Sequence, residues 1–253
     1  MEVCRATCHP PAMRMIGLIG GMSWESSAEY YRILNQGVRD ALGPTASARC
    51  LLWSFDFAEI EALQHRGDWE GLSERLVHAA RQLETAGAEG VLICTNTMHR
   101  LAAAVEAGVS IPLLHIADPT AERIKADGIR TVGLLGTAFT MEQSFYRDRL
   151  ARQHGLQVIV PEEADRRTVH RVIYEELVAG QVLPASRAAY RAILARLAEA
   201  GAEAVILGCT EIMLLIGPED SPVPVYDTTA IHAAAAVAWV LTKAPGGGTV
   251  AGA

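Results

Sequence analysis

Val205-Ile-Leu-Gly-Cys-Thr-Glu-Ile212 is an apolar run that ends at a glycine and continues into a thiol, a hydroxyl and a carboxyl group. This order is typical of a buried strand followed by a polar loop. In an open parallel sheet, ligands bind outside the carboxyl ends of the strands. Cys209 is therefore predicted to lie where a substrate would bind.

The segment that leads into this stretch has a counterpart earlier in the chain. Leu197-Ala-Glu-Ala-Gly-Ala-Glu-Ala-Val205 and Leu83-Glu-Thr-Ala-Gly-Ala-Glu-Gly-Val91 share Leu, Ala, Gly, Ala, Glu and Val at a constant offset of 197 − 83 = 114. Carried forward, the same offset aligns Thr95 with Cys209. The two residues are therefore predicted to occupy equivalent positions.

A second internal similarity supports the first. Ile16-Gly-Leu-Ile-Gly-Gly21 resembles Val132-Gly-Leu-Leu-Gly-Thr137, and both pairs occur in the same order along the chain. The alternative is that Ala-Gly-Ala-Glu is ordinary punctuation between a helix and a strand. We favour two similar halves that pack as a pseudo-twofold pair, with Thr95 and Cys209 facing each other across a cleft.

Strands are predicted to alternate with helices along the whole chain. This alternation indicates an α/β fold of two doubly wound lobes with parallel sheets. The first lobe would span 15–117 and be closed by the C-terminal helix 230–241, and the second would span 118–229. Residues 1–14 and 244–253 are predicted to be a disordered and a frayed tail. The predicted strands are Met15–Ile19, Arg49–Ser54, Val91–Ile93, Pro112–Ile116, Thr131–Leu135, Gln157–Val160, Val205–Leu207 and Pro224–Tyr226, and the later helices include Val169–Leu177 and Ala185–Glu199.

Composition excludes several classes of protein. The chain has 253 residues, half of them hydrophobic, a mean hydropathy of +0.18 and a net charge of −7 without a basic stripe. These values are typical of a compact α/β protein, and nucleic acid is not predicted as a partner. No apolar run reaches the roughly 18 residues of a membrane span, so no membrane partner is predicted. Five scattered cysteines favour thiol chemistry in a reducing cytoplasm over disulfides.

Metal is not predicted as a cofactor. Cys4, Cys8 and His9 are the densest group of metal-binding residue types, but they lie in a Pro-containing segment without a second ligand pair.

Hydroxyl, amide and thiol side chains follow the predicted strands. Such groups, with helix N-termini behind them, can hold a carboxylate without a full positive charge. Gly20-Gly21 before a helix would add free backbone N–H groups for an anion. A thiol among them would become a general base if a helix N-terminus lowered its pKa. The alternative for that thiol is a small buried hydrophobe. The side chains concerned are Ser23, Thr95, Asn96, Thr97, Thr137, Thr140, Cys209, Thr210 and Glu211.

Four motifs in order resemble the aspartate/glutamate racemase family, most closely its L-aspartate/glutamate-specific or broad-specificity branch. The resemblance covers about Met15 to Leu241 and implies a cofactor-independent, cytoplasmic and commonly dimeric enzyme with its active site between two lobes. The motifs are Ile16-Gly-Leu-Ile-Gly-Gly-Met-Ser-Trp-Glu-Ser26, Cys94-Thr-Asn-Thr-Met-His99, Leu135-Gly-Thr-Ala-Phe-Thr-Met-Glu142 and Leu207-Gly-Cys-Thr-Glu-Ile212.

The resemblance also implies residue roles. Members usually carry one cysteine per lobe, and the two exchange the Cα proton from opposite faces. The second matches Cys209, whereas the first falls on Thr95, a threonine that the branch shares. Cys94 is one position early and should face away. By similarity, Asn96, Thr97 and Thr140 would hold the α-carboxylate, and Met22, Gln64, Thr210 and Glu211 would line the substrate.

Two departures separate this chain from typical aspartate racemases. A lysine that helps to hold an acidic side chain has no match in Val172-Ile-Tyr-Glu-Glu-Leu-Val178, and a threonine replaces the first cysteine. A hydroxyl can donate or relay a proton but is a poor base near neutral pH. The acidic substrate and symmetric racemisation are therefore open questions.

These observations together predict an amino-acid racemase that acts by 1,1-proton transfer without a cofactor, with Cys209 as the base and Thr95 on the opposite face. Its partners would be an amino-acid substrate and a second copy of the chain. One alternative is an arylmalonate-decarboxylase-like or maleate-isomerase-like enzyme of the same superfold. Another is a non-catalytic sensor of carboxylates or amino acids.

Overall fold

A computed structural model describes residues 13–242. Most of the two predicted tails lies outside the described residues. The same is true of the possible metal ligands Cys4, Cys8 and His9. Within the described residues, Arg14 donates its backbone N–H to the carbonyl of Val240 at 3.0 Å. The described chain therefore begins with a hydrogen bond to its last helix.

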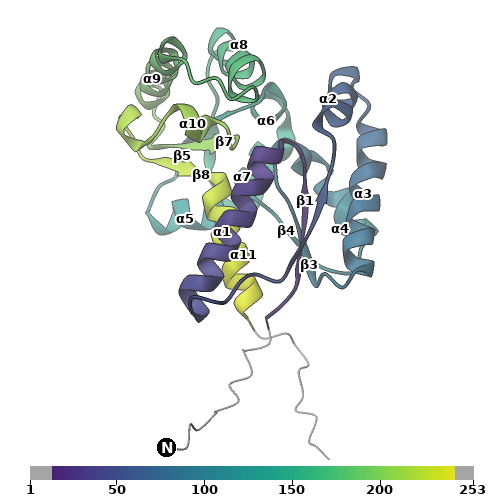
Figure 1. Cartoon of the computed structure of the whole chain (residues 1–253). Coiled ribbons are helices and arrows are strands. Elements are labelled where there is room, and N and C mark those ends of the chain that lie inside the picture. Colours follow the sequence, from purple (N-terminus) through teal and green to yellow (C-terminus); the bar gives the residue numbers. More distant parts are fainter. Residues whose placement is uncertain (1–12, 243–253) are drawn as a thin grey trace, which may run out of the picture.

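The first lobe is a parallel sheet of four strands in the order β2-β1-β3-β4, shown in purple and blue in Figure 1. Every neighbouring pair is parallel. Its elements are β1 (Ile16–Gly20), α1 (Trp24–Leu42), β2 (Cys50–Ser54), α2 (Phe57–Arg66), α3 (Trp69–Thr85), β3 (Gly90–Ile93), η1 (Thr97–Leu101), α4 (Ala102–Gly108) and β4 (Leu113–Leu114). The next helix, α5 (Ala117–Ala126), packs on the second sheet.

The second lobe repeats this arrangement in the order β6-β5-β7-β8, with all pairs parallel. The identical order confirms the predicted α/β fold and its duplication, since β3 and β7 hold the same place in their sheets. Its elements are β5 (Thr131–Gly136), α6 (Ala138–Glu142), α7 (Ser144–His154), β6 (Gln157–Ile159), α8 (Glu163–Val172), η2 (Ile173–Leu177), α9 (Pro184–Glu199), β7 (Ala204–Gly208), α10 (Ile212–Leu215), η3 (Pro218–Asp220), β8 (Val225–Asp227) and α11 (Thr228–Leu241).

Successive side chains of each central strand enter opposite cores. In β7, Val205 and Leu207 pack against α8, α9 and α10, whereas Ala204 and Ile206 pack against α5 and α7. A strand buried on both faces has no solvent side, so every position is apolar. Fully burying each such aliphatic side chain contributes about 1.5–3 kcal/mol. This burial holds the end of β7, and hence the residues after it, at a fixed place.

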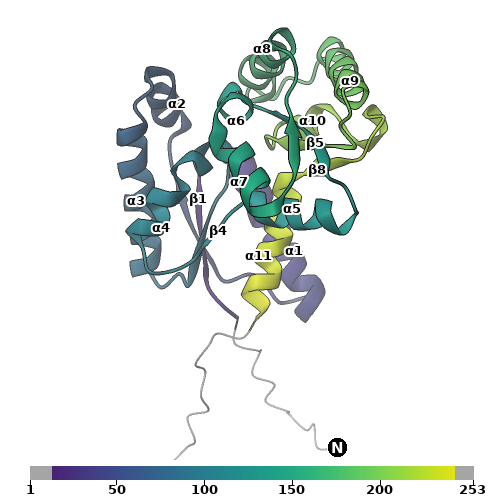
Figure 2. The same ribbon diagram turned by 180° about the vertical axis from the view of Figure 1, so that it is seen from behind.

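The first sheet is covered in the same way. Val91 and Ile93 of β3 face α2, α3 and α4, whereas Leu92 lies in a core with α1 and α11. Figures 1 and 2 both show α11 beside α1, so the last helix of the chain packs on the first sheet. None of the helices formed by residues 13–242 is both long and apolar enough to cross a bilayer.

The main differences from the predicted elements lie around residues 163–177. The helix begins at Glu163 rather than Val169, and its last five residues, Ile173–Leu177, form a π-helix. The first turns of α8 consist largely of charged and polar residues, so the apolar periodicity starts late. In addition, α11 begins at Thr228, two residues before the predicted start at Ala230.

Candidate active site

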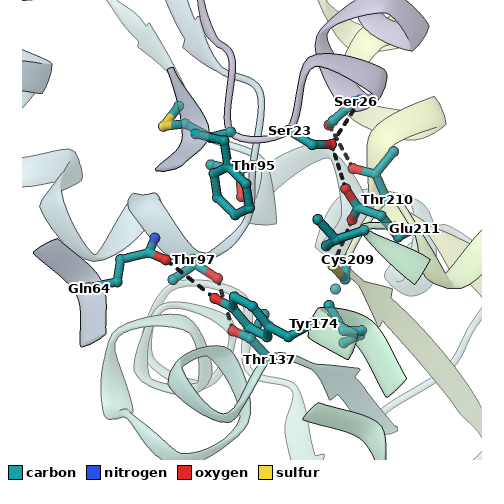
Figure 3. Close-up of a pocket in the computed structure, with 15 residues that line it drawn as sticks. Ser23, Ser26, Gln64, Thr95, Thr97, Thr137, Tyr174, Cys209, Thr210 and Glu211 are labelled. Carbon is teal, nitrogen blue, oxygen red and sulfur yellow. Dashed lines mark hydrogen bonds between the residues drawn. The ribbon is translucent and has the colours of Figure 1, made fainter. Parts of the chain in front are cut away.

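A pocket opens where β1, β3, β5 and β7 end, and both lobes contribute to it (Figure 3). The helix α2 and the π-helix η2 complete its wall. The lining residues are Met22, Ser23, Ser26, Phe57, Gln64, Thr95, Thr97, Thr137, Ile173, Tyr174, Val178, Gly208, Cys209, Thr210 and Glu211.

Thr95 and Cys209, the two predicted catalytic residues, both line this pocket. They follow the equivalent strands β3 and β7, and Figure 3 shows them on opposite sides. The neighbouring Cys94 is buried in the core between the first sheet and α1, away from the pocket. The expected alternation of Cys94 and Thr95 thus agrees with the structure.

The thiol of Cys209 is hydrogen bonded to a carboxylate. Its Sγ donates to Oε2 of Glu211 at 2.9 Å, and Ser23 Oγ donates to Oε1 of the same carboxylate at 2.7 Å. Desolvation, and then the negative charge of Glu211, raise the pKa of the Cys209 thiol well above its ordinary value. The condition considered from the sequence, a helix N-terminus that lowers this pKa, is therefore not met. The helix that follows, α10, has four residues and begins only at Ile212.

Hydroxyl groups join the two lobes beside this carboxylate. Ser26 Oγ donates to the carbonyl of Cys94 at 2.8 Å and lies 2.8 Å from Thr210 Oγ1. Because a serine hydroxyl has one hydrogen, Thr210 must be the donor in the second bond. The loop after β7 is thereby tied to α1 and to the loop after β3.

In the Gly20-Gly21 loop, the N–H of Gly21 is not free to bind an anion. The N–H of Gly21 donates to Ser27 Oγ at 2.8 Å. Gly21 has φ +80°, and a Cβ at this position would lie 2.2 Å from the carbonyl oxygen of Phe55. Glycine is required here for the chain to turn toward the pocket.

Three threonine hydroxyls, from the segments that follow β3 and β5, form a second polar cluster in the site. Thr97 Oγ1 lies 2.9 Å from Thr137 Oγ1 and 3.3 Å from Thr140 Oγ1. Of the three predicted carboxylate-binding residues, only Thr97 lines the pocket. Thr140, the third member of the cluster, is fully buried, and Asn96 donates its amide N–H to Thr228 Oγ1 at 3.0 Å. The two therefore support the lining from behind, and Thr137 joins Thr97 as a lining residue.

The remaining predicted contacts, Met22 and Gln64, do line the pocket. Tyr174 of η2 donates its phenol to Gln64 Oε1 at 3.3 Å and so connects the lobes. We did not predict Tyr174, although it lies in the segment where the family lysine has no match. Its position depends on the π-helix, which no local sequence signal announces.

Comparison with known proteins identifies the family. The sequence profile of the Asp/Glu/hydantoin racemase family matches residues 19–236. The chain belongs to this family. The resemblance that the four motifs carried is thereby confirmed, and the pocket lies at the motifs themselves.

Individual relatives agree with this assignment. The crystal structure of a candidate Asp/Glu racemase from Yersinia pestis is 53% identical, has a TM-score of 0.86, and the match covers 91% of this chain and 100% of that chain. An aspartate racemase homologue from Pyrococcus horikoshii OT3 is 37% identical with a TM-score of 0.75, over 87% and 96% of the two chains. The broad specificity amino-acid racemase RacX of Bacillus subtilis (strain 168) is 21% identical over 69% of this chain and 74% of its own length.

His99 holds the threonine of this racemase fold in place. Its Nε2 accepts the backbone N–H of Ile116 at 3.2 Å, so its Nδ1 carries the hydrogen and donates to the carbonyl of Thr95 at 2.8 Å. The ring is buried beside His115 and His232. Burial lowers the pKa of His99 well below its ordinary value and keeps it neutral.

Acid should destabilise the fold through these histidines. Burial lowers the pKa of His115 to about 2 and of His232 to about 4, whereas both would titrate near 6.5 when unfolded. Above about pH 6.5 both histidines are neutral in the folded and in the unfolded chain, and the stability of the fold is fully present. As the pH falls from about 6.5 toward the pKa values of the folded state, only the unfolded chain takes up these protons, so stability is lost. We expect the free energy of unfolding to fall by about 1.4 kcal/mol per pH unit for each such group.

The test is urea denaturation between about pH 7 and pH 5. His115→Asn should flatten the pH dependence, because its side-chain oxygen can still accept the Ala117 N–H but cannot titrate. His65→Asn, at an exposed position, is the control. An unchanged slope in His115→Asn would contradict this account.

Cys94 is expected to be structural. Its side chain is 1% exposed, packs in the core between the first sheet and α1, and does not line the pocket, so it cannot reach a bound substrate. Cys94→Ala should keep most of the turnover and cost about 1 kcal/mol of stability. Initial rates and denaturation curves check both parts. A variant as inactive as Cys209→Ala would show that the side chain takes part in the chemistry.

Among residues 13–242, no three His, Cys, Asp or Glu side chains are grouped in a way that could hold a metal ion.

Proposed function

We propose that this protein is an amino-acid racemase that moves the Cα proton by 1,1-proton transfer and needs no pyridoxal phosphate. The observation that carries the proposal is the pair Thr95 and Cys209, at equivalent strand ends on opposite sides of one pocket. Inversion of a carbon centre needs a proton acceptor on one face and a donor on the other.

Cys209 is the base in this proposal, and Glu211 prepares it. Glu211 accepts the thiol proton along the existing hydrogen bond, and the resulting thiolate removes the Cα proton. A thiolate whose conjugate thiol has a raised pKa is a stronger base once it is formed. On the other face, Thr95 returns a proton directly or through water.

The hydroxyl cluster would hold the substrate. Thr97 and Thr137 share a hydrogen bond, and each hydroxyl has one hydrogen, so one of them can donate to the α-carboxylate while it accepts from the other. The α-carboxylate gains charge as the Cα proton leaves, and a donor held in place by its neighbour needs little reorganisation when that charge develops. Thr140 and Asn96 keep these donors in position from behind.

The cofactor-free chemistry is consistent with the lysine content. Pyridoxal phosphate is held as a Schiff base with a lysine, and the chain has two lysines. Lys125 is exposed on α5, and Lys243 lies outside the described residues. The proposal also keeps a cytoplasmic setting and a homodimer, as the family resemblance implies.

Heavy water tests the reaction. The protein should incorporate deuterium at Cα of its L-substrate while the D-enantiomer accumulates, as followed by mass spectrometry and chiral chromatography. Binding without exchange would identify a sensor. Protonation of an arylmalonate after loss of carbon dioxide, without racemisation of any amino acid, would identify a decarboxylase, for which a single pocket thiol suffices.

Thr95→Cys should change the direction of the reaction. We assign the proton of the L-form to Cys209, as in the family, so Thr95 must act as the base for the D-form. A thiol is about 10⁵-fold or more acidic than a hydroxyl, so the variant should raise D-to-L turnover more than L-to-D turnover. Initial rates from both enantiomers measure this. Equal rates in the wild type, with no directional change in the variant, would refute it.

A further inference from the structure

The pocket contains no cationic side chain. Among the fifteen residues that line it in the described chain, none is Lys, Arg or His, and Glu211 is the one acidic residue. An uncompensated charge moved from water into such a site costs several kcal/mol. The charges of a bound substrate must therefore be matched by Glu211, by the hydroxyl groups and by the substrate itself.

Two arginines on adjoining elements, Arg171 and Arg100, are engaged elsewhere. Arg171, at the end of α8, pairs with Glu176 at 2.8 Å. Arg100, in η1, stacks over the ring of Trp69 at 3.8 Å and donates to Gln143 at 2.8 Å. Neither lines the pocket.

An α-amino acid brings one positive and one negative charge at Cα, which this pocket can accommodate. The α-ammonium matches the carboxylate of Glu211, and the α-carboxylate matches the hydroxyls of Thr97 and Thr137. The residues that remain as a wall for the side chain are uncharged. Met22, Phe57, Ile173, Val178 and Gly208 are apolar, and the polar ones are hydrogen bonded in pairs, Ser26 with Thr210 and Tyr174 with Gln64.

We infer that the substrate is an amino acid with an uncharged side chain, and that aspartate and glutamate are disfavoured. The inference rests on the proposed function and names the substrate class of the same site. A side-chain carboxylate would meet apolar carbon or neutral polar groups that are already hydrogen bonded to one another. It would also lie in a pocket whose one charged residue has the same sign.

Matched amides isolate the effect of charge. Glutamine and glutamate differ by one amide in place of a carboxylate, as do asparagine and aspartate, with nearly the same shape. We expect the kcat/KM for Cα deuterium exchange to be about 100-fold or more higher for the better amide than for its acid. Exchange of glutamate or aspartate as fast as the matched amide overturns the inference and leaves the racemase proposal standing.

A variant then tests the wall itself. Tyr174→Lys places an ammonium in it, and Tyr174→Met is an uncharged control of similar length. Lysine should raise the glutamate-to-glutamine ratio of kcat/KM by about 10-fold or more, and methionine should not. Because the readout is a ratio, loss of overall activity does not obscure it. No change with lysine overturns the assignment of this wall to the side chain.

Failure of the two proposals is distinguishable. If no amino acid in the panel, charged or neutral, exchanges its Cα proton, the proposed racemase function fails. If exchange occurs but favours the acids, only the inference about the side chain fails.

Discussion

Cys209→Ala is expected to lower kcat by about 10²–10⁴-fold, because it removes the group that accepts the Cα proton. The fold should survive, since the side chain lies at the pocket and packs only at the edge of the second core. Cys209→Ser should be almost as inactive, because a hydroxyl is a far weaker acid and does not form the base. Deuterium exchange from the L-substrate under initial-rate conditions measures both.

The matched control for Cys209→Ala is Cys50→Ala, which removes another free, half-buried cysteine from the edge strand β2. It should retain native rates. A Cys209→Ala protein with near-native exchange would remove the thiol from the mechanism. The carboxylate beside it would then be the next candidate for the base.

Glu211→Gln is expected to have the second largest effect, a loss of about 10²-fold in kcat near neutral pH. The amide cannot take the thiol proton that Glu211 Oε2 now accepts at 2.9 Å. It can still accept the hydroxyl of Ser23, so the loop should keep its shape. KM should rise as well, because the negative charge opposite the α-ammonium is lost.

The pH profile separates this role from a structural one. Glu211 raises the pKa of the Cys209 thiol, so the Gln variant has a lower thiol pKa. Without Glu211 as the proton acceptor, the thiolate forms only when the pH approaches this pKa. The activity of Glu211→Gln should therefore recover as the pH increases, whereas the activity of a misfolded site would not. Glu219→Gln, at an exposed position, is the control. A native kcat with a native pH profile in Glu211→Gln would exclude the proposed proton acceptor.

Much of the site was predictable because it lies at strand ends. Gly208 and Cys209 follow an apolar run, and the constant offset of 114 aligned Thr95 with Cys209. Equivalent strands in duplicated lobes carry equivalent loops, so local sequence was enough to assign both residues to the pocket. The burial of Cys94 followed from the alternation of side chains in extended backbone.

The state of the thiol was not predictable. The sequence allowed a helix N-terminus to lower the pKa of Cys209, but α10 is short and the thiol donates to Glu211 instead. Glu211 is held there by Ser23, which is 188 positions away in the chain. A contact of that range depends on how the lobes pack, and no local pattern encodes it.

By itself, the sequence determined the α/β class, the duplication, the family and the pair Thr95 and Cys209, because strand periodicity and short motifs are local properties. Only the tertiary structure determined which polar groups reach the pocket. It placed Asn96 and Thr140 behind the wall and brought Tyr174 into it. Those positions depend on helix packing and on hydrogen bonds between lobes, which exist only once distant segments are folded together.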